Sequence, residues 1–223
     1  MLPVSYLLRN LGRRPLRTGL TVAGISLVVA VYFLMGSVAE TLVRSFRSTG
    51  GADEVVIVQA GAMTIDYSSV DRSSLTYVQT LDGVAHRDGS PLVSPELAVG
   101  TVFRHRDRDQ KASLRGVTAL APSVYGQVRL AAGEWPGRGR RAAVGRSLAA
   151  KLDLEMGDEL EIEGDRWRIV GILDSGGRVH DQEIWLDLEE LAAAANRKSY
   201  SSYTLRVEDP AAAERLVETC LLY

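Results

Sequence analysis

The stretch TGLTVAGISLVVAVYFLMGSVA, residues 18–39, contains no charged side chain and decides the architecture of the chain. At about 1.5 Å of rise per helical residue, a helix of this length spans roughly 30 Å, the thickness of the hydrocarbon core of a bilayer. The residues before it are few and basic, and those after it are mixed and polar. The sequence therefore predicts one transmembrane helix at 18–39, followed by a water-soluble part at 40–223.

Residues 1–17 form a basic segment in front of the apolar run. Leu7, Leu8 and Leu11 recur at helical spacing, with arginines among and after them. Such a helix can lie in the headgroup layer, with its leucines toward the acyl chains and its arginines on lipid phosphate. Pro15 lacks an N–H and is expected to end this segment just before the span. The alternative is a disordered basic tail.

Charge predicts the orientation of the span. Four arginines and no acidic residue precede it, whereas acidic and basic residues are mixed behind it. By the positive-inside rule, the amino terminus is expected in the cytoplasm and residues 40–223 outside a bacterial inner or plasma membrane. A cleaved signal peptide is the alternative, because Ser37-Val38-Ala39 resembles a cleavage site. The apolar run is about twice as long as the apolar region of a typical signal peptide, which favours a retained anchor.

Composition excludes several classes of protein. The net charge of −2 argues against a protein that binds nucleic acid along its whole length. Cys220 is the single cysteine, so the chain can form no internal disulfide, and no Cys/His cluster indicates a zinc site. Gly24, Ser26, Ala30 and Gly36 are small residues within the span that allow another helix to approach, a weak indication of helix partners.

The soluble part shows alternating strand and helix patterns. A buried strand is expected at 55–58, and further strands are expected at 97–103, 112–117, 182–186 and 203–207. The strands expected at 159–163 and 167–172 are predicted to form an antiparallel hairpin. Helices are expected at 74–80, 142–152 and 188–195, and a last helix is expected to begin at Asp209-Pro210, an N-cap followed by a proline. Residues 62–75 are predicted as a loop with little structure. The charged octet 104–111 is predicted as a solvated hairpin loop rather than a nucleic-acid patch, because acidic residues interrupt it and it lacks aromatic residues.

No set of residues predicts catalysis, cofactor binding or metal binding. The three histidines, His86, His105 and His180, lie in polar contexts and are expected at the surface, including His180 beside Asp181. The sequence around Ser147 lacks the second glycine of a nucleophile elbow. A structural role is expected for the remaining candidates. Glu159, Glu161 and Glu163 share the solvent face of a strand, and Cys220 is expected to pack on a helix. Arg138, Arg140 and Arg141 lie in a glycine-rich loop, and a loop of this kind could otherwise hold phosphate.

A series of short motifs resembles one family in order and spacing. Near the span they are Arg9-Asn10-Leu11, Arg13-Arg14-Pro15-Leu16-Arg17-Thr18, Leu20-Thr21 and Gly24-Ile25. In the soluble part they are Gly116-Val117, Gly133-Glu134-Trp135-Pro136, Ala143-Val144-Gly145, Ala149, Leu154, Gly157-Asp158, Val170-Gly171-Ile172, Ile184-Trp185-Leu186, the strand at 203–207 and Asp209-Pro210. Together they resemble the MacB/LolC/FtsX-type ABC transporter permeases and their MacB-like periplasmic core domain.

This resemblance implies a fold and a role. The expected fold is one amino-terminal spanning helix followed by a two-lobed, extracytoplasmic α+β domain at 40–223. The implied partners are an ABC ATPase subunit, a further permease chain and membrane lipid, and no nucleic acid. Members of the family export peptides or drugs, extract lipoproteins or regulate cell-wall hydrolases. A complete permease of this type has three more spanning helices, which are expected to come from another chain or to have been lost.

Three functions remain open from the sequence. The first is a permease component, not itself an enzyme, that couples a separate ATPase to an extracytoplasmic domain. The second is a membrane-anchored binding or sensing module without transport activity. The third is an anchored hydrolase, for which no nucleophile–base pair is present in the sequence.

Overall fold

The computed structural model describes residues 15–47, 51, 53–106 and 108–221, with the side chains of the first helix at 16–37 and of the last at 210–216. The predicted interfacial segment therefore lies, up to residue 14, outside the described residues. The chain divides into two compact units, Met1–Ser48 and Thr49–Tyr223, and each is described by itself.

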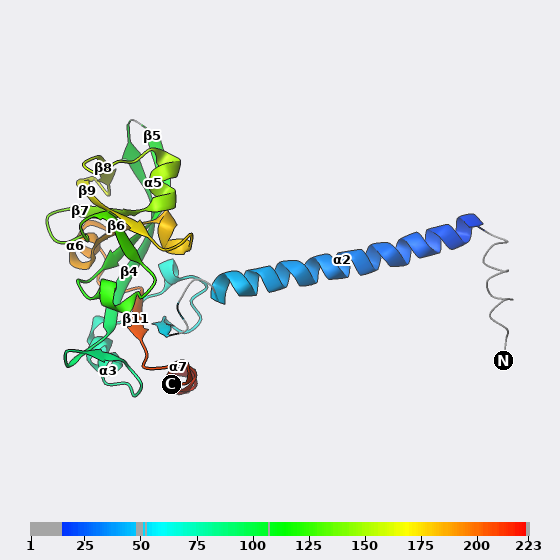
Figure 1. The fold of residues 1–223 in the computed structure, drawn as a ribbon, viewed down its shortest axis with the longest axis horizontal. Helices are drawn as coiled ribbons and strands as arrows, with labels where there is room; N and C mark the ends of the chain where they lie inside the picture. The colour runs from blue at the N-terminus through cyan, green and yellow to red at the C-terminus, as the bar shows by residue number, and fades with distance from the viewer. Residues whose placement is uncertain (1–14, 48–50, 52, 107, 222–223) are drawn as a thin grey trace. The chain divides into compact units, whose positions relative to one another are not determined.

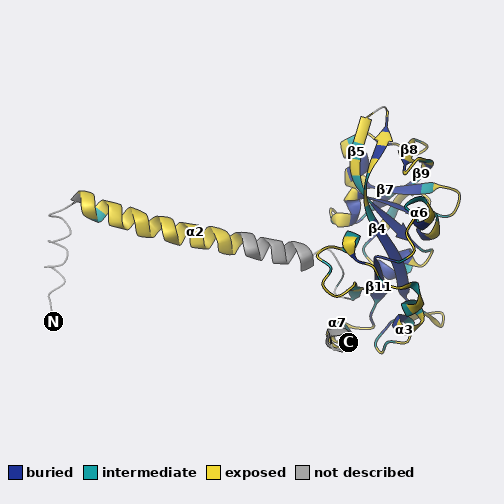
Figure 2. Cartoon of the chain, turned by 180° about the vertical axis from the view of Figure 1, so that it is seen from behind, coloured by how far each residue is buried: buried dark blue, intermediate teal, exposed yellow. Residues whose placement is uncertain are grey.

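The first unit contains the long helix α2, Pro15–Arg47. Pro15 occupies its first position, where the missing N–H breaks no intrahelical bond. Within α2, the stretch Leu16–Ser37 is long and apolar enough to cross a membrane, with a mean hydropathy of 2.1, and none of it is buried. In Figure 2 the ribbon of this stretch is coloured almost entirely as exposed. The apolar stretch overlaps the predicted span over residues 18–37.

The second unit is an α+β domain that is built on one large sheet. Its strands follow the order β1-β11-β4-β5-β10-β7-β9-β6, and β8 pairs with both β4 and β9. The strands of this sheet are β1 (Glu54–Ile57), β4 (Val93–His105), β5 (Arg108–Val117), β6 (Arg129–Gly133), β7 (Arg141–Gly145), β8 (Glu159–Ile162), β9 (Asp165–Asp174), β10 (Glu183–Asp187) and β11 (Ser202–Arg206). A separate two-stranded ribbon contains β2 (His86–Arg87) and β3 (Ser90–Pro91).

Helices and 3-10 turns connect these strands. They are η1 (Ile65–Tyr67), η2 (Arg72–Ser74), α3 (Leu75–Gln79), α4 (Ala121–Val124), α5 (Arg146–Leu152), η3 (Val179–Gln182), α6 (Leu188–Ala194) and α7 (Pro210–Leu221). Figure 1 shows them around the long strands β4 and β5. Residues 49–223 form one unit, so the two predicted lobes share one sheet.

Six strands of the sheet close into a hydrogen-bonded ring. β4 pairs with β5, which continues through β10, β7 and β9 to β8. The ring closes where β8 meets β4 again, through the single pair Arg104 and Glu161. β4 and β8 therefore share fewer residue pairs than any other two neighbouring strands of the ring.

Alternation along the strands separates two hydrophobic clusters. On β10, Ile184 and Leu186 belong to the larger cluster, which also receives side chains from α3, α5, α6 and α7. Trp185 points to the opposite side and joins a smaller cluster with Val117, Tyr125 and residues near α4. The side chains of all three β10 residues are fully buried. Successive side chains of a strand point to opposite faces, which explains this division.

The region 142–152, predicted as one helix, is instead the strand β7 followed by the short helix α5. Its first residues pair with β10 on one side and β9 on the other. β7 is therefore a central strand, and residues 142–145 are all buried, so both of its faces are covered. Ala, Val and Gly suit such a strand. Gly145 at the junction lies against the main chain of η3, where a Cβ would come within 2.4 Å of Asp181. The helical spacing of the apolar residues was therefore misleading at the start of this region.

Three other expectations change in the structure. The octet 104–111 is mostly strand, because β4 continues to His105 and β5 starts at Arg108. Residues 62–75 contain η1, η2 and a bridge between Val70 and Tyr200, rather than an unstructured loop. The strand at 55–58 lies at the edge of the sheet as β1 and is only half-buried, so the prediction of a buried strand was wrong.

Other elements agree with the prediction. β8 and β9 form the expected antiparallel hairpin, with positive φ at Glu163 and Gly164 in its two-residue turn. α7 begins after Asp209, whose side chain accepts a 2.7 Å hydrogen bond from the main-chain N–H of Ala212. The predicted cap of the last helix is thus present.

Candidate functional site

A cluster of buried charged groups lies within the second unit and centres on Arg115 of β5. Its guanidinium donates two hydrogen bonds to Glu183 of β10, from Nε at 2.8 Å and from Nη2 at 2.7 Å. Nη1 donates a third bond, at 2.7 Å, to Glu96 of β4. All three residues are more than nine-tenths buried. One positive charge therefore holds two carboxylates from its two neighbouring strands.

Aromatic groups add hydrogen bonds to this cluster, although Oε1 of Glu96 is buried without a partner among the described residues. The Tyr125 hydroxyl donates to Glu96 at 2.7 Å, and the Trp185 indole N–H donates to Glu183 at 3.0 Å. His180 of η3 places Nδ1 2.9 Å from the same Glu183 carboxylate. The rings of Tyr125, His180 and Trp185 lie within 4.9–5.6 Å of one another, centroid to centroid.

The charges of this cluster change its acid–base properties. Burial raises the pKa of the Glu183 carboxyl, but the charge and hydrogen bonds of Arg115 outweigh this effect and hold its pKa well below the usual range. Burial of Tyr125 and the adjacent Glu96 charge raise the pKa of the phenol well above its ordinary value. Glu183 is therefore ionised and Tyr125 neutral near neutral pH.

The geometry assigns this cluster a structural role. A buried ion pair costs desolvation free energy and is tolerated where hydrogen bonds satisfy the charges. The cluster joins β4, β5, β10, η3 and the residue after α4 in one network. Its members are enclosed by the fold, so a substrate reaches them only if the domain opens.

Two of the three histidines are buried, contrary to the expectation that all are at the surface. His180 belongs to the cluster described above, and its ring contacts Glu183, not the adjacent Asp181. The Asp181 carboxylate instead accepts hydrogen bonds from the main-chain N–H groups of Ser175 and Gly177. His105 is also buried, because β4 extends further than expected.

The remaining predicted residues have separate surroundings. Ser147 is exposed on α5, and the three glutamates of 159–163 lie on the solvent side as expected. His86 is exposed, with Nδ1 2.8 Å from the carbonyl oxygen of Val84. The side chain of Cys220 lies outside the described residues. Within the described ranges, no three His, Cys, Asp or Glu side chains converge as a metal site.

The glycine-rich loop at 137–141 does bind an anion, but the anion belongs to the protein. The main-chain N–H groups of Gly139 and Arg140 donate to the two carboxylate oxygens of Glu190, at 2.7 and 2.8 Å. Arg140 also forms a 2.8 Å ion pair with Asp165. These contacts support the structural role predicted for the loop, because Glu190 occupies the position that a phosphate would take.

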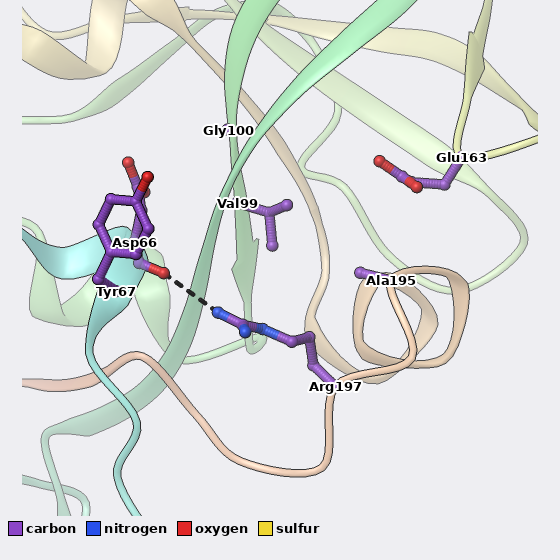
Figure 3. A pocket seen from close by; sticks show the side chains of 7 residues that line it. All are labelled: Asp66, Tyr67, Val99, Gly100, Glu163, Ala195 and Arg197. Atoms are coloured by element: carbon purple, nitrogen blue, oxygen red, sulfur yellow. Dashed lines mark hydrogen bonds between the residues drawn. The ribbon is translucent and has the colours of Figure 1, made fainter.

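A surface pocket of about 330 Å³ lies beside β4. It is lined by residues from η1, from β4, from the turn after β8 and from the end of α6, namely Asp66, Tyr67, Val99, Gly100, Glu163, Ala195 and Arg197. Figure 3 shows Asp66 and Tyr67 on one side, Glu163 on the other, and Val99 between them. Arg197 crosses the pocket and donates a 3.1 Å hydrogen bond from Nη2 to the main-chain oxygen of Asp66.

Sequence reasoning missed both the buried charges and the pocket. Glu96 and Arg115 lie in strands whose neighbouring residues are apolar, so a single charge inside an apolar stretch was the available signal. Four segments that are distant in sequence line the pocket, so no local sequence pattern predicts it.

Comparison with known proteins gives a consistent picture of the fold. Residues 18–219 match the MacB-like periplasmic core domain family. The extracellular domain of YknZ, an ABC-type transporter from Gram-positive bacteria, superimposes with a TM-score of 0.54 and 16% identity, over 74% of this chain and 86% of its own. The periplasmic region of MacB from Actinobacillus actinomycetemcomitans gives a TM-score of 0.57 and 12% identity, over 78% and 86%. No curated protein matches the sequence.

Proposed function

The chain belongs to the family of MacB-like periplasmic core domains, and from that premise we propose that it couples a separate ATPase to an extracytoplasmic domain as the permease component of an ABC-type system. One observation carries the proposal. The family match runs from residue 18 to 219, so it includes the apolar part of α2 and the folded domain in one chain. The system exports a substrate, releases lipoproteins or regulates the cell envelope.

In this proposal, α2 anchors the chain in the membrane. Its apolar stretch exposes large side chains, including Leu27, Phe33 and Leu34, each about two-thirds exposed. Lipid or neighbouring helices of a further permease chain would cover such a surface in a bilayer. The arginines before the span favour a cytoplasmic amino terminus, which leaves residues 49–223 outside.

Labelling of an introduced cysteine tests this topology. Met63 is 95% exposed on the extracytoplasmic unit, and Cys220 is the single natural cysteine. In a Cys220→Ser background, Met63→Cys is expected to react with a membrane-impermeant maleimide in intact spheroplasts. The matched control is Cys220→Ser alone, which has no thiol to label. Reaction of Met63→Cys only after lysis would reverse the proposed orientation.

Copurification tests the ATPase partnership. The full chain, extracted in mild detergent, is expected to retain an ABC ATPase and to change its rate of ATP hydrolysis. A chain with residues 1–48 deleted is the control, because it lacks α2 and should retain no ATPase. If the full chain retains an ATPase no better than this control, the coupling role is wrong. The pocket beside β4 would then favour the alternative, an anchored binding or sensing module without transport activity.

A further inference from the structure

The edge of β4 is unpaired between the end of β11 and the start of β8. On the side away from β5, β11 pairs with β4 only as far as Glu96, and β8 pairs with it only at Arg104. The Ser201 hydroxyl satisfies the main-chain N–H and carbonyl of Ala98, between these strands. Beyond Ala98, no described strand pairs with this edge before Arg104.

The register of the strands identifies the groups that this gap leaves free. Ala98 directs its main-chain N–H and carbonyl away from β5, toward Ser201, and Arg104 pairs with β8 on the same side. Main-chain groups of an antiparallel strand alternate between its two sides. Gly100 and Val102 therefore also direct their N–H and carbonyl groups into the gap, where the Val102 carbonyl accepts only a long, 3.5 Å hydrogen bond from the Thr101 hydroxyl. Extending the β8 register would place Glu163 opposite Val102, but Glu163 has a φ of 52° and begins the turn to β9.

The pocket lies at this same edge. Gly100 lines it, together with Val99, Tyr67 and Arg197. Tyr67 is 84% exposed and Val102 is 54% exposed, so apolar surface adjoins the free main-chain groups. A volume of about 330 Å³ is at the lower end of the range for ligand pockets. The space suits a few residues of extended chain better than a large molecule.

Charge specifies the occupant further. The pocket contains two carboxylates, Asp66 and Glu163, and one guanidinium, Arg197. Oδ1 of Asp66 is buried and accepts no hydrogen bond from the described residues, whereas Glu163 accepts one from the Thr101 hydroxyl at 2.7 Å. The two carboxylates and the one guanidinium give the lining a net negative charge, which favours a positively charged group on the ligand.

We propose that the unpaired edge of β4, together with the pocket beside it, is a docking site for an extended segment of a partner polypeptide that carries one basic group. The segment adds as a short strand to β4, exchanges main-chain hydrogen bonds with Gly100 and Val102, and directs a lysine, an arginine or its terminal ammonium toward Asp66. This interaction does not depend on the ATPase partnership proposed above, and its test involves no nucleotide.

A capped pentapeptide of alternating valine and threonine, with lysine at its centre and a fluorescent label, is the probe. Its affinity for the full chain in lipid nanodiscs is measured by fluorescence anisotropy up to millimolar concentration. Two further peptides are compared, one with N-methylated main-chain amides and one with norleucine in place of lysine. The lysine peptide is expected to bind at least about tenfold more tightly than either.

Gly100→Pro and Gly100→Ala form the matched pair of variants. Proline removes the N–H that faces the gap but leaves the pairing with β5 intact, and proline is tolerated at strand edges for this reason. Nothing lies within 4 Å of a Cβ at position 100, so Gly100→Ala is expected to fold. Gly100→Pro should weaken peptide binding about tenfold, and Gly100→Ala less than about twofold. Asp66→Asn should weaken binding of the lysine peptide but not of the norleucine peptide.

Several results would overturn the proposal. They are absence of binding at millimolar concentration, equal binding by Gly100→Pro and the parent chain, and equal binding of the N-methylated peptide. Self-association of the peptide-free chain that Gly100→Pro abolishes would identify a second copy as the occupant and would also overturn it. If Gly100→Pro does not fold, Asp66→Asn and the N-methylated peptide still decide the result.

Discussion

Arg115 organises the domain at the scale of single residues. Its guanidinium holds Glu183 through two hydrogen bonds and Glu96 through one, where water cannot replace it. The three residues belong to adjacent strands, so the cluster also fixes how β4, β5 and β10 lie against one another. Such a cluster favours one arrangement of the strands over others only while every charge keeps its partner.

Removal of the central charge is expected to destabilise the domain strongly. Arg115→Met keeps a long side chain but leaves two carboxylates buried without a cation, which should lower the free energy of unfolding by about 3–5 kcal/mol. Urea denaturation followed by tryptophan fluorescence measures this loss. Arg166→Met is the control, because Arg166 is 82% exposed and should change stability by less than about 0.5 kcal/mol. Equal effects of the two variants would show that the buried cluster contributes no special stability.

The pH dependence of stability follows from the pKa of Glu183, which is well below its usual range in the folded protein. At a pH between the pKa of Glu183 in the folded protein and its pKa in the unfolded chain, the unfolded chain binds more protons. The free energy of unfolding therefore rises with pH in that range. The stabilisation by ionised Glu183 is complete above the ordinary glutamate pKa of about 4.3. It is lost as the pH falls toward the pKa of Glu183 in the folded protein. In urea titrations at several pH values, Glu183→Gln should show a shallower loss below about pH 4 than the parent chain. Parallel curves would contradict this role for Glu183.

The buried cluster also shows where sequence reasoning reaches its limit. The apolar neighbours of Arg115 predict its strand correctly, whereas the strand predicted at 97–103 starts one residue after Glu96. Neither pattern shows which strands are adjacent. That information lies in long-range pairing, because residues 96, 115 and 183 meet only after the sheet has formed. The same limit explains why His105 and His180 were expected at the surface.

At the scale of elements, local signals with a physical mechanism predicted the structure well. The cap at Asp209, the β8–β9 hairpin and the apolar stretch of α2 follow from residues close in sequence. Region 142–152 failed because its periodicity fits a helix, whereas pairing with β9 and β10 favours a strand in its first half. Tertiary pairing overrides local propensity in such a central strand.

Gly145 connects β7 to α5 at a point of close backbone approach. A methyl group there would come within 2.4 Å of the Asp181 main chain, so α5 or η3 must move. We expect Gly145→Ala to destabilise the domain by about 1–3 kcal/mol, the usual cost of overpacking. Thermal unfolding measures the effect, with Gly100→Ala as the control in open space. A midpoint for Gly145→Ala equal to that of the control would mean that the η3 loop yields without cost.

A charge in the middle of α2 tests its role as a membrane span. Val29 lies within the apolar stretch and is 46% exposed. Val29→Arg should disfavour insertion by about 2.5–3.5 kcal/mol, and Val29→Leu should have little effect. Carbonate extraction of membranes is expected to release part of the arginine variant and none of the leucine variant. Equal retention of both variants would argue against a span at this position.

At the scale of the whole molecule, the extracytoplasmic unit has the features of an independent domain. Both hydrophobic clusters draw their residues from position 55 onward, and the large sheet is complete within Thr49–Tyr223. The family match supports the same organisation, a folded domain joined to a spanning helix. Membrane attachment and domain stability should therefore be separable properties of the chain.

Excision of the helix tests this separation. A chain of residues 49–223 is expected to be soluble without detergent and to unfold cooperatively, because the deleted residues supply none of the described core. Its thermal midpoint should lie within about 4 °C of the domain transition of the full chain in detergent, which corresponds to roughly 1 kcal/mol. Circular dichroism in the same detergent provides the matched comparison for both chains. Aggregation of the excised domain, or a much lower midpoint, would show that residues 1–48 stabilise the domain as well as anchoring it.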